Sequence, residues 1–469
     1  VSADATMGSA TVSAAEVEEG AEATFTATAN AGYKFTCWTV GTDTISTENP
    51  YTATISAATE LTANFEALVP SIVLTATPDV ERQFVFTVET AAKIFIDWGD
   101  GELKEYKLDT TYALYEGTTI ANVPVNFYSF DDDCKINVFS VSDIRMKRID
   151  VTKLTNLTTL TVSGTGLSTI DISKATKLTE LNLEGNNLSS VDMSNNPDLW
   201  MVILSNNKLT DIDLSNNKSV GWLHANGNEI ETINLDGMSK LSELNLSDNM
   251  ISEIDLSDCS SLYTFACENN KLKTIDLNGL RNLKIVYLYG NEFRFSTLPE
   301  PTASWMQYTY GNQSPVEVEL TSDGKIDLSS EKDVSGTATS YKWFTVSGTE
   351  LIENEDVVVE DGITTFLKGF GEDIYCVMTN SVFPNLELRT IDLEVLSSEI
   401  ETVDASDFKV IVNQDKIIVN SAESVVEVYG INGMLIEKAC IVDGSATVVG
   451  LEKGIYIVKT AGAVTKVVI

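Results

Sequence analysis

Residue types on which enzymes rely are scarce in this chain, and the few present are poorly placed for catalysis. The 469 residues include one histidine, His224, so mechanisms and metal sites that need two histidines are excluded. No nucleophile elbow, phosphate-binding glycine loop or His-Glu-x-x-His motif occurs. A triad through His224 would need a nucleophile in the same groove, whereas Cys267 is predicted to face a core. We therefore expect no enzymatic activity and no cofactor.

Carboxylates and amides are abundant, but their spacing indicates a structural role. One row of aspartates recurs with Ser or Thr two residues later in most copies, which favours local hydrogen bonds over calcium binding. These aspartates are Asp150, Asp171, Asp192, Asp213, Asp255 and Asp276. A row of asparagines is predicted to satisfy buried turn backbone, and its members are Asn186, Asn207, Asn228, Asn249, Asn270 and Asn291. The acidic run Asp131, Asp132 and Asp133 is expected to be solvated, so no metal site is predicted.

The overall charge excludes some classes of partner. With 69 Asp+Glu against 31 Lys+Arg, the formal net charge is −38, so binding to nucleic acid and to anionic lipid is disfavoured. No apolar stretch approaches the roughly 20 residues that cross a bilayer. The first eight residues read as a strand and a turn without a signal peptide, and we expect that sequence upstream of Val1 was removed. The six cysteines lack metal-ligand spacing, and most are expected to be buried free thiols.

A repeat of 21 residues supplies the elements that must position any binding residue. Its copies begin at Leu157, Leu178, Leu199, Val220, Leu241, Leu262 and Leu283. An eighth, degenerate unit starts at Ile136 and is expected to cap the open end. Alternation around Leu181 and Leu183 points both side chains inward, while Leu188, Val191 and Met193 are predicted to close the core from the other side. The second half of each unit is β-branched and too short for a helix, so an extended convex side is expected.

The pattern L-x-x-L-x-L-x-x-N-x-L resembles a leucine-rich repeat and covers residues 136–303. That resemblance implies a solenoid whose short strands form one parallel sheet. The third, fifth and seventh residues of each unit then point outward from the concave sheet, where exposed aromatic and apolar side chains mark interface contacts. The candidate binding residues are Met201, Ile203, Trp222, His224, Tyr263, Ile285, Tyr287 and Tyr289. Their alternative role is to be covered by the following module.

The N-terminal flank contains two further β segments. Residues 1–68 carry the run from Ala31 to Trp38 and resemble a divergent InlB B-repeat module, a small β-grasp-like spacer, with Phe35 and Trp38 in its core. Residues 69–135 contain Trp98-Gly99-Asp100-Gly101, which resembles the turn of PKD-like β-sandwiches. An Asp-Gly pair supports a tight hairpin, and Trp98 can fill the sandwich. This segment is alternatively an elaborate cap on the solenoid.

The C-terminal flank also contains two predicted β modules. Residues 304–398, with Trp343 and Cys376, resemble an immunoglobulin-like sandwich. Its early strand has Ile326 and Leu328 where a second cysteine would stand, so no inter-sheet disulfide is expected. Residues 405–469 are similar to the C-terminal sorting domain of type IX secretion, although they end on Val468-Ile469 without a terminal basic residue.

The sequence as a whole predicts a mainly β protein, with a leucine-rich repeat solenoid flanked by small β-grasp-like and β-sandwich modules. The resemblances imply a secreted or cell-surface, adhesin-like protein of a Bacteroidetes-like bacterium, which binds a protein ligand on its concave face as a monomer. The acids Glu180, Glu184, Glu243 and Glu268 favour a basic or neutral ligand. Two alternatives stay open, namely capture of carbohydrate or mucin glycan by the same aromatics, and a structural spacer for a missing N-terminal domain.

Overall fold

The computed structural model describes most of the chain as two compact units. Residues not described are 31, 77–80, 89–91, 109–112, 119, 121–122, 130–135, 322–323, 395–408, 414–415, 422, 432, 452–454, 462–463 and 469. The first unit holds residues 1–266 with 278–283, and the second holds 267–277 with 284–469. The predictions for Asp131 to Asp133 and for Cys134 therefore lie outside the described residues. Within the described ranges, no helix has the length and apolar character needed to span a membrane.

The first unit opens with a small module of two sheets. One sheet has the order β1-β7-β4-β5 and the other β2-β3-β6. Its strands are β1 (Ser2–Ala3), β2 (Gly8–Val12), β3 (Glu22–Ala29), β4 (Tyr33–Val40), β5 (Asp43–Ser46), β6 (Tyr51–Thr54) and β7 (Thr62–Ala67). Trp38 is fully buried, and its ring lies 5.5 Å from that of Phe35 and 5.9 Å from that of Phe25. The predicted core role of Trp38 is confirmed, and Phe35 is half-buried and packs against the same core.

The next segment forms strands that join two different sheets. Its strands are β8 (Ile72–Ala76), β9 (Glu81–Val88), β10 (Ala92–Asp97), β11 (Leu103–Leu108), β12 (Ala113–Thr118) and β13 (Pro124–Ser129). Between β10 and β11, Asp97 Oδ1 accepts hydrogen bonds from the backbone N–H of Gly99 and Gly101, at 2.8 and 3.0 Å. Trp98 is buried and donates through Nε1 to the hydroxyl of Tyr106. The hairpin and the buried tryptophan are as predicted.

The same segment closes the open edge of the solenoid. Strand β9 pairs antiparallel with β14 (Ile136–Ser142), and β12 pairs with β9 on its far side. Strand β8 pairs with β15 (Met146–Asp150), so a second sheet has the order β11-β10-β13-β8-β15. The expectation that the degenerate unit from Ile136 itself caps the open end is therefore wrong. Without β9, the edge of β14 would carry unpaired backbone groups. This pairing corresponds to the alternative prediction that residues 69–135 form a cap on the solenoid.

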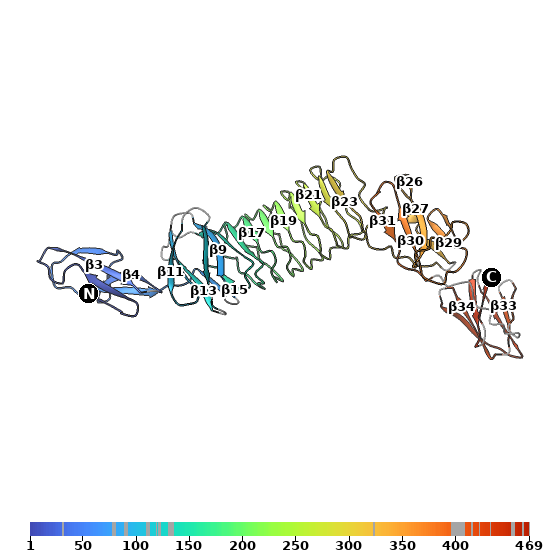
Figure 1. The fold of residues 1–469 in the computed structure, drawn as a ribbon, viewed down its shortest axis with the longest axis horizontal. Helices are drawn as coiled ribbons and strands as arrows, with labels where there is room; N and C mark the ends of the chain where they lie inside the picture. The colour runs from blue at the N-terminus through green and yellow to red at the C-terminus, as the bar shows by residue number, and fades with distance from the viewer. Residues whose placement is uncertain are drawn as a thin grey trace. The chain divides into compact units, whose positions relative to one another are not determined.

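The repeats form a parallel β-solenoid with one short strand for each turn (Figure 1). In the first unit these strands are β16 (Thr159–Ser163), β17 (Glu180–Asn182), β18 (Met201–Ile203), β19 (Trp222–His224), β20 (Glu243–Asn245) and β21 (Thr264–Ala266). Each residue pairs with the one 21 positions later, so equivalent side chains stand in rows. Leu181, Leu183, Leu188 and Met193 are at most 1% exposed, whereas Val191 is only half-buried. Apart from β15, the described convex side is irregular and non-helical.

The asparagine row holds the turns together from inside. Asn207 Nδ2 donates to the carbonyl oxygens of Leu183 and Leu204, at 2.9 and 3.0 Å. Its Oδ1 accepts from the backbone N–H of Leu188 at 3.0 Å. The same pattern recurs at Asn186, Asn228, Asn249 and Asn291. The predicted structural role of this row is confirmed, because each amide pairs polar backbone that would otherwise be unsatisfied.

The aspartate row makes the predicted local bonds. Asp150, Asp171, Asp192, Asp213 and Asp255 each accept a hydrogen bond from the backbone N–H two residues later, at 2.8 to 3.1 Å. Hydrogen bonds from these N–H groups and from the neighbouring Ser or Thr hydroxyls hold the pKa of each carboxyl below its ordinary value of 3.8.

Acid should therefore weaken the solenoid in a defined range of pH. A carboxyl whose pKa is lowered in the folded state binds protons more readily in the unfolded chain. Its contribution to the stability of the folded state is therefore present above about pH 3.8 and is lost as the pH falls further. The urea concentration at the midpoint of unfolding, measured from pH 5 to pH 2.5, should decrease once the pH is below about 3.8. The triple variant S173A/S194A/S215A, which removes three of the hydroxyl donors, should show a smaller fall. An equal fall in both proteins would contradict the account.

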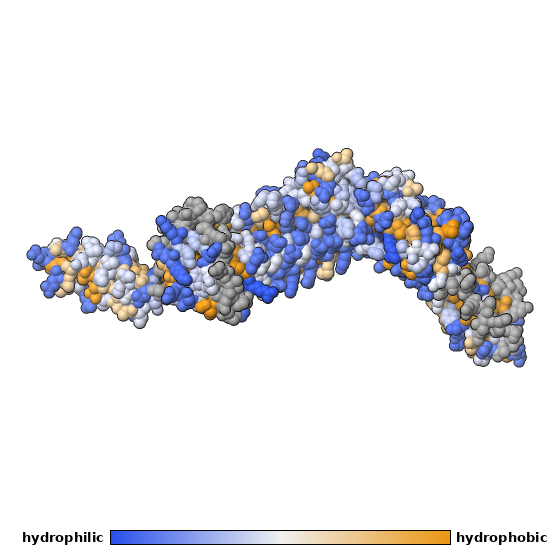
Figure 2. Space-filling view, in the orientation of Figure 1, coloured by the Kyte–Doolittle hydropathy of each residue, from blue (hydrophilic) through white to orange (hydrophobic). Residues whose placement is uncertain are grey.

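The second unit contains the last repeat strands and two sandwiches. Strand β22 (Ile285–Tyr287) pairs parallel with β23 (Gln307–Thr309). The next sheets have the orders β24-β29-β28, β25-β26 and β27-β30-β31. Their elements are β24 (Lys325–Asp327), η1 (Ser329–Glu331), β25 (Asp333–Val334), β26 (Thr337–Ala338), β27 (Ser340–Thr345), β28 (Val357–Glu360), β29 (Ile363–Phe366), β30 (Ile374–Thr379) and β31 (Glu387–Arg389). Apolar residues gather on the surface over β27 to β31 (Figure 2). Val346, directly after β27, and Ile352, before β28, are exposed.

The first of these sandwiches has the predicted buried tryptophan. Trp343 is 2% exposed and stands directly opposite Cys376 across β27 and β30. Its Nε1 donates to Thr364 Oγ1 at 3.1 Å, and Ile326 and Leu328 are buried as expected.

The described cysteines of the chain are free thiols. Cys259, Cys267 and Cys376 are buried, Cys37 is half-buried, and Cys440 is exposed.

The last part of the chain forms a second sandwich of a three-stranded and a four-stranded sheet. The orders are β32-β33-β36 and β35-β34-β37-β38. The strands are β32 (Lys409–Asn413), β33 (Lys416–Asn420), β34 (Val425–Gly430), β35 (Leu435–Cys440), β36 (Ser445–Val449), β37 (Ile455–Lys459) and β38 (Val464–Val468). Ile417, Val419, Val426, Val428 and Val458 are fully buried between the two sheets.

Candidate functional site

Strands β18 and β19 bring four of the predicted binding residues together. The register places Met201 opposite Trp222 and Ile203 opposite His224, on the face of the parallel sheet that points away from the core. We keep the name concave face for this side of the sheet. Trp222 is 38% exposed, and Met201, Ile203 and His224 are half-buried. The side chains between them along the strands, Val202 and Leu223, are fully buried, so the backbone below the cluster is held by the core. The four side chains thus form one surface on a rigid support.

Trp200 belongs to this surface and was not among the predicted residues. It stands one position before β18, is 45% exposed, and its ring centroid lies 5.3 Å from that of Trp222. The ring lies over Gly221, where an added Cβ would come within 2.6 Å of Trp200 Nε1. At the position of Gly221 the preceding repeat carries Trp200 itself, and the other repeats carry Thr158, Thr179, Ser242, Tyr263 and Lys284. This glycine was the sequence signal that could have revealed the neighbouring aromatic ring. We call Trp200, Met201, Ile203, Trp222 and His224 the tryptophan patch.

Alanine at Gly221 should separate the two tryptophans without unfolding the solenoid. The new Cβ would displace the exposed ring of Trp200, which can rotate into solvent, so the unfolding free energy should change by less than about 1 kcal/mol. The near-ultraviolet circular dichroism of the ring pair should weaken. The matched variant Thr158→Ala, at the same repeat position two turns before Trp200, should leave that signal unchanged. An unaltered spectrum in Gly221→Ala would show that Trp200 does not rest on Gly221.

One charged contact borders the patch. His224 Nε2 lies 2.8 Å from Glu243 Oε1 on the neighbouring strand β20, and both side chains are about a third exposed. Along the row of third positions, Glu180, Met201, Trp222 and Glu243 are successive partners on four adjacent strands. The apolar patch therefore has a carboxylate at each end of this row.

The remaining predicted residues lie elsewhere. Tyr263 is 43% exposed but precedes β21, at the same repeat position as Trp200. Ile285, Tyr287 and Tyr289 belong to the second unit, where Ile285 stands opposite Gln307 and Tyr287 opposite Thr309. Tyr289 is 41% exposed, and Ile285 and Tyr287 are half-buried. Their role in binding stays a prediction, and the tryptophan patch is the part of the candidate site that one unit assembles by itself.

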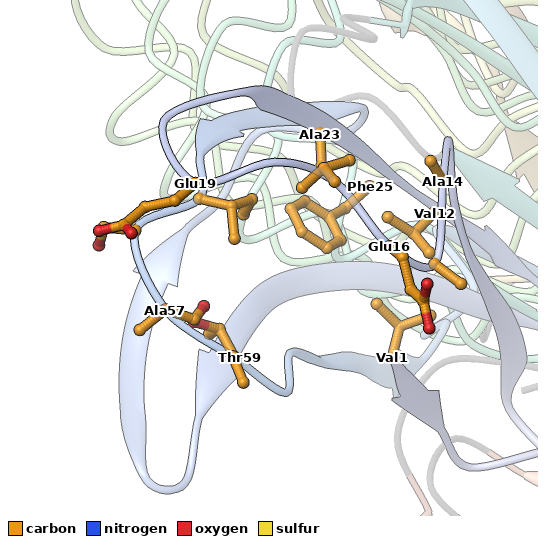
Figure 3. Close-up of a pocket in the computed structure, with 14 residues that line it drawn as sticks. Val1, Val12, Ala14, Glu16, Glu19, Ala23, Phe25, Ala57 and Thr59 are labelled. Atoms are coloured by element: carbon orange, nitrogen blue, oxygen red, sulfur yellow. The ribbon is translucent and has the colours of Figure 1, made fainter.

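The N-terminal module contains a cavity of about 560 Å³ (Figure 3). Its lining is mostly small and aliphatic, and it includes Val12, Ala23 and Phe25. The carboxylates of Glu16 and Glu19 point away from the Phe25 ring in Figure 3. Ligand pockets combine an apolar wall with a few convergent polar groups, and here the charged groups do not converge. The cavity is therefore a weaker candidate than the concave surface.

Metal-holding clusters and buried thiols are two possible kinds of reactive group in the described part of the chain. Among the described residues, no group of three or more His, Cys, Asp and Glu side chains is placed to hold a metal ion. Burial raises the pKa of the Cys259 and Cys376 thiols to about 12 and that of Cys267 further, so these thiols are not activated as nucleophiles. The arrangement at the tryptophan patch is suited to contact with a ligand surface.

The fold and this surface define a leucine-rich-repeat-like β-solenoid of about 21 residues a turn, flanked by small β modules. The Divergent InlB B-repeat domain family matches residues 1–68, which confirms the prediction for that segment. Among solved structures, the chain is similar to an internalin, InlF, of Listeria monocytogenes, with 17% identity, 38% of this chain and 69% of that chain covered, and a TM-score of 0.25. It is also similar to TLR13 in its complex with ssRNA13, with 19% identity, 35% of this chain and 27% of that chain covered, and a TM-score of 0.30. No curated protein matches the chain.

Proposed function

We propose that this chain is a non-catalytic, adhesin-like surface protein that binds a protein ligand on the concave face of its solenoid. The observation that carries the proposal is the tryptophan patch, in which Trp200 and Trp222 are 45% and 38% exposed beside Met201 and Ile203. Exposed tryptophans on a soluble surface bury large apolar area when a partner covers them, and they dominate binding energy where they occur in interfaces. The fully buried residues beneath the patch keep these contacts in place, which reduces the entropy that is lost on binding.

The flanking modules support a location at or outside the cell surface. Residues 1–68 match a family described by its relation to InlB, and residues 405–469 resemble a sorting domain for secretion. The formal net charge of −38 also suits a protein that must remain dispersed outside the cell. In this proposal, the modules on either side present and attach the solenoid, and the concave face makes the specific contact.

The proposal is tested by offering the full chain to an array of purified cell-surface ectodomains printed beside mucin and defined glycans. The wild type is compared with the double variant W200A/W222A and with Ile352→Ala, which truncates an exposed apolar residue of the second unit. We expect binding to an ectodomain that Ile352→Ala retains and W200A/W222A loses. Binding to glycans alone would replace the proposal with carbohydrate capture. Ectodomain binding that both variants retain would move the site away from the patch.

A further inference from the structure

Apart from His224, which contacts Glu243, the ionisable side chains of the concave strands in the first unit are all acidic. Their repeat segments contain Glu180, Glu184, Glu243 and Asp248 but neither Lys nor Arg, and these segments are 158–164, 179–185, 200–206, 221–227, 242–248 and 263–266. The lysines of these turns are exposed at positions on the other sides of the repeat, namely Lys153, Lys174, Lys177, Lys208, Lys218 and Lys240. The surface around the tryptophan patch is therefore complementary to a cationic partner and repels an acidic one.

Two of these acids lie at a separation that sets the spacing of basic residues expected in a partner. Glu180 and Glu243 stand in the same row as Met201 and Trp222, with one residue on each of four adjacent strands. Adjacent strands lie about 4.8 Å apart, so three spacings separate the backbones of the two acids by about 14 Å. An extended peptide advances about 3.3 Å a residue and covers that distance in four residues. A chain that crosses the strands would thus meet an acid, the apolar patch and a second acid in turn.

We propose that the protein ligand presents an extended basic segment to this row, with an apolar side chain on the tryptophan patch and Lys or Arg four residues apart at Glu180 and Glu243. This inference rests on the proposed function and specifies its partner. The ring faces of Trp200 and Trp222 are also attractive to a guanidinium or ammonium group that passes over them. His224 contacts Glu243 through Nε2 at 2.8 Å and holds that carboxylate beside the patch.

The test uses selection from a random 12-residue peptide library displayed on phage, with the full chain as bait at pH 7.5 and 50 mM salt. Peptides that also bind W200A/W222A are discarded. Relative to the unselected library, we expect the remaining peptides to be enriched at least threefold in one pattern. In this pattern, two Lys or Arg residues four positions apart flank an apolar residue. The charge-reversed bait E180K/E243K should instead enrich Asp or Glu at that spacing. The matched control E231K/E253K changes two exposed acids outside the concave strands and should select as the wild type does.

Affinities of the selected peptides give a second readout. For one synthetic peptide, E180Q/E243Q should weaken binding about fivefold at 50 mM salt, because each exposed ion pair contributes modestly, and the difference should shrink at 500 mM. Two outcomes would overturn this inference and leave the proposed function intact. In the first, peptides that bind the wild type but not W200A/W222A lack basic residues. In the second, they are basic but show no preferred spacing. A selection that returns no patch-dependent peptide, together with no patch-dependent ectodomain, would overturn both.

Discussion

Alanine at both Trp200 and Trp222 should weaken binding of a protein ligand by at least about 30-fold. Tryptophans at the centre of an interface typically cost about 2 kcal/mol or more when truncated, and 2 kcal/mol corresponds to about 30-fold in the dissociation constant. The two rings lie 5.3 Å apart and are the most exposed aromatic side chains of the patch, so a partner that covers one covers the other. The loss should appear mainly in the dissociation rate, measured by biolayer interferometry with the ectodomain that the array identifies.

The fold must be shown to survive this change. Both tryptophans lie outside the core, so the double variant should keep the far-ultraviolet circular dichroism spectrum and the melting temperature of the wild type within a few degrees. Ile352→Ala should bind like the wild type. A double variant that remains folded and binds within threefold of the wild type would contradict the assignment of the site.

Leucine at Asn207 should lower the free energy of unfolding by about 3 kcal/mol. The amide accepts a hydrogen bond from the N–H of Leu188 and donates to the carbonyls of Leu183 and Leu204. Leucine offers neither donor nor acceptor, and a buried polar group left without a partner costs about 1 to 3 kcal/mol. The two carbonyls keep hydrogen bonds from Asn186 and Asn228. The N–H of Leu188 is therefore the group most affected, because its bond to Asn207 is lost. Chemical denaturation monitored by circular dichroism measures the effect.

An exposed asparagine in the preceding repeat provides the control for this change. Asn195 makes only a long 3.4 Å contact with Ser194, so Asn195→Ala should change the unfolding free energy by less than about 0.5 kcal/mol. Equal small effects at Asn207 and Asn195 would show that the asparagine row does not support the turns. Because repeats depend on their nearest neighbours, the loss at Asn207 should also broaden the transition.

The solenoid could be predicted because each of its interactions recurs every 21 residues. One copy of the pattern shows only apolar alternation, but the stacked copies fix which positions face the core, and the parallel register follows from the equal spacing. The rows of Asn207 and Asp192 are readable for the same reason. The pairing of Met201 with Trp222 and of Ile203 with His224 therefore follows from the spacing alone.

Features that depend on a break in the period were missed or were predicted only as alternatives. Trp200 occupies a position that is usually Thr, Ser or Tyr, and its place in the patch depends on the missing side chain of Gly221 in the next turn. The closing of the solenoid edge by β9 depends on antiparallel pairing with β14 between segments that share no repeat. Hydrophobic alternation predicts that such a strand exists but does not say which edge it joins.

A photo-crosslinking experiment tests the central claim most directly. A benzophenone amino acid replaces Ile203, beside Trp222 and His224 on the concave face, and in a matched protein it replaces the exposed Thr232 outside the concave strands. Both proteins are irradiated with the ectodomain that binds the wild type, and the products are identified by mass spectrometry. The account predicts a covalent adduct from position 203 and none from position 232. Adducts from position 232 alone would place the ligand away from the concave face and contradict it.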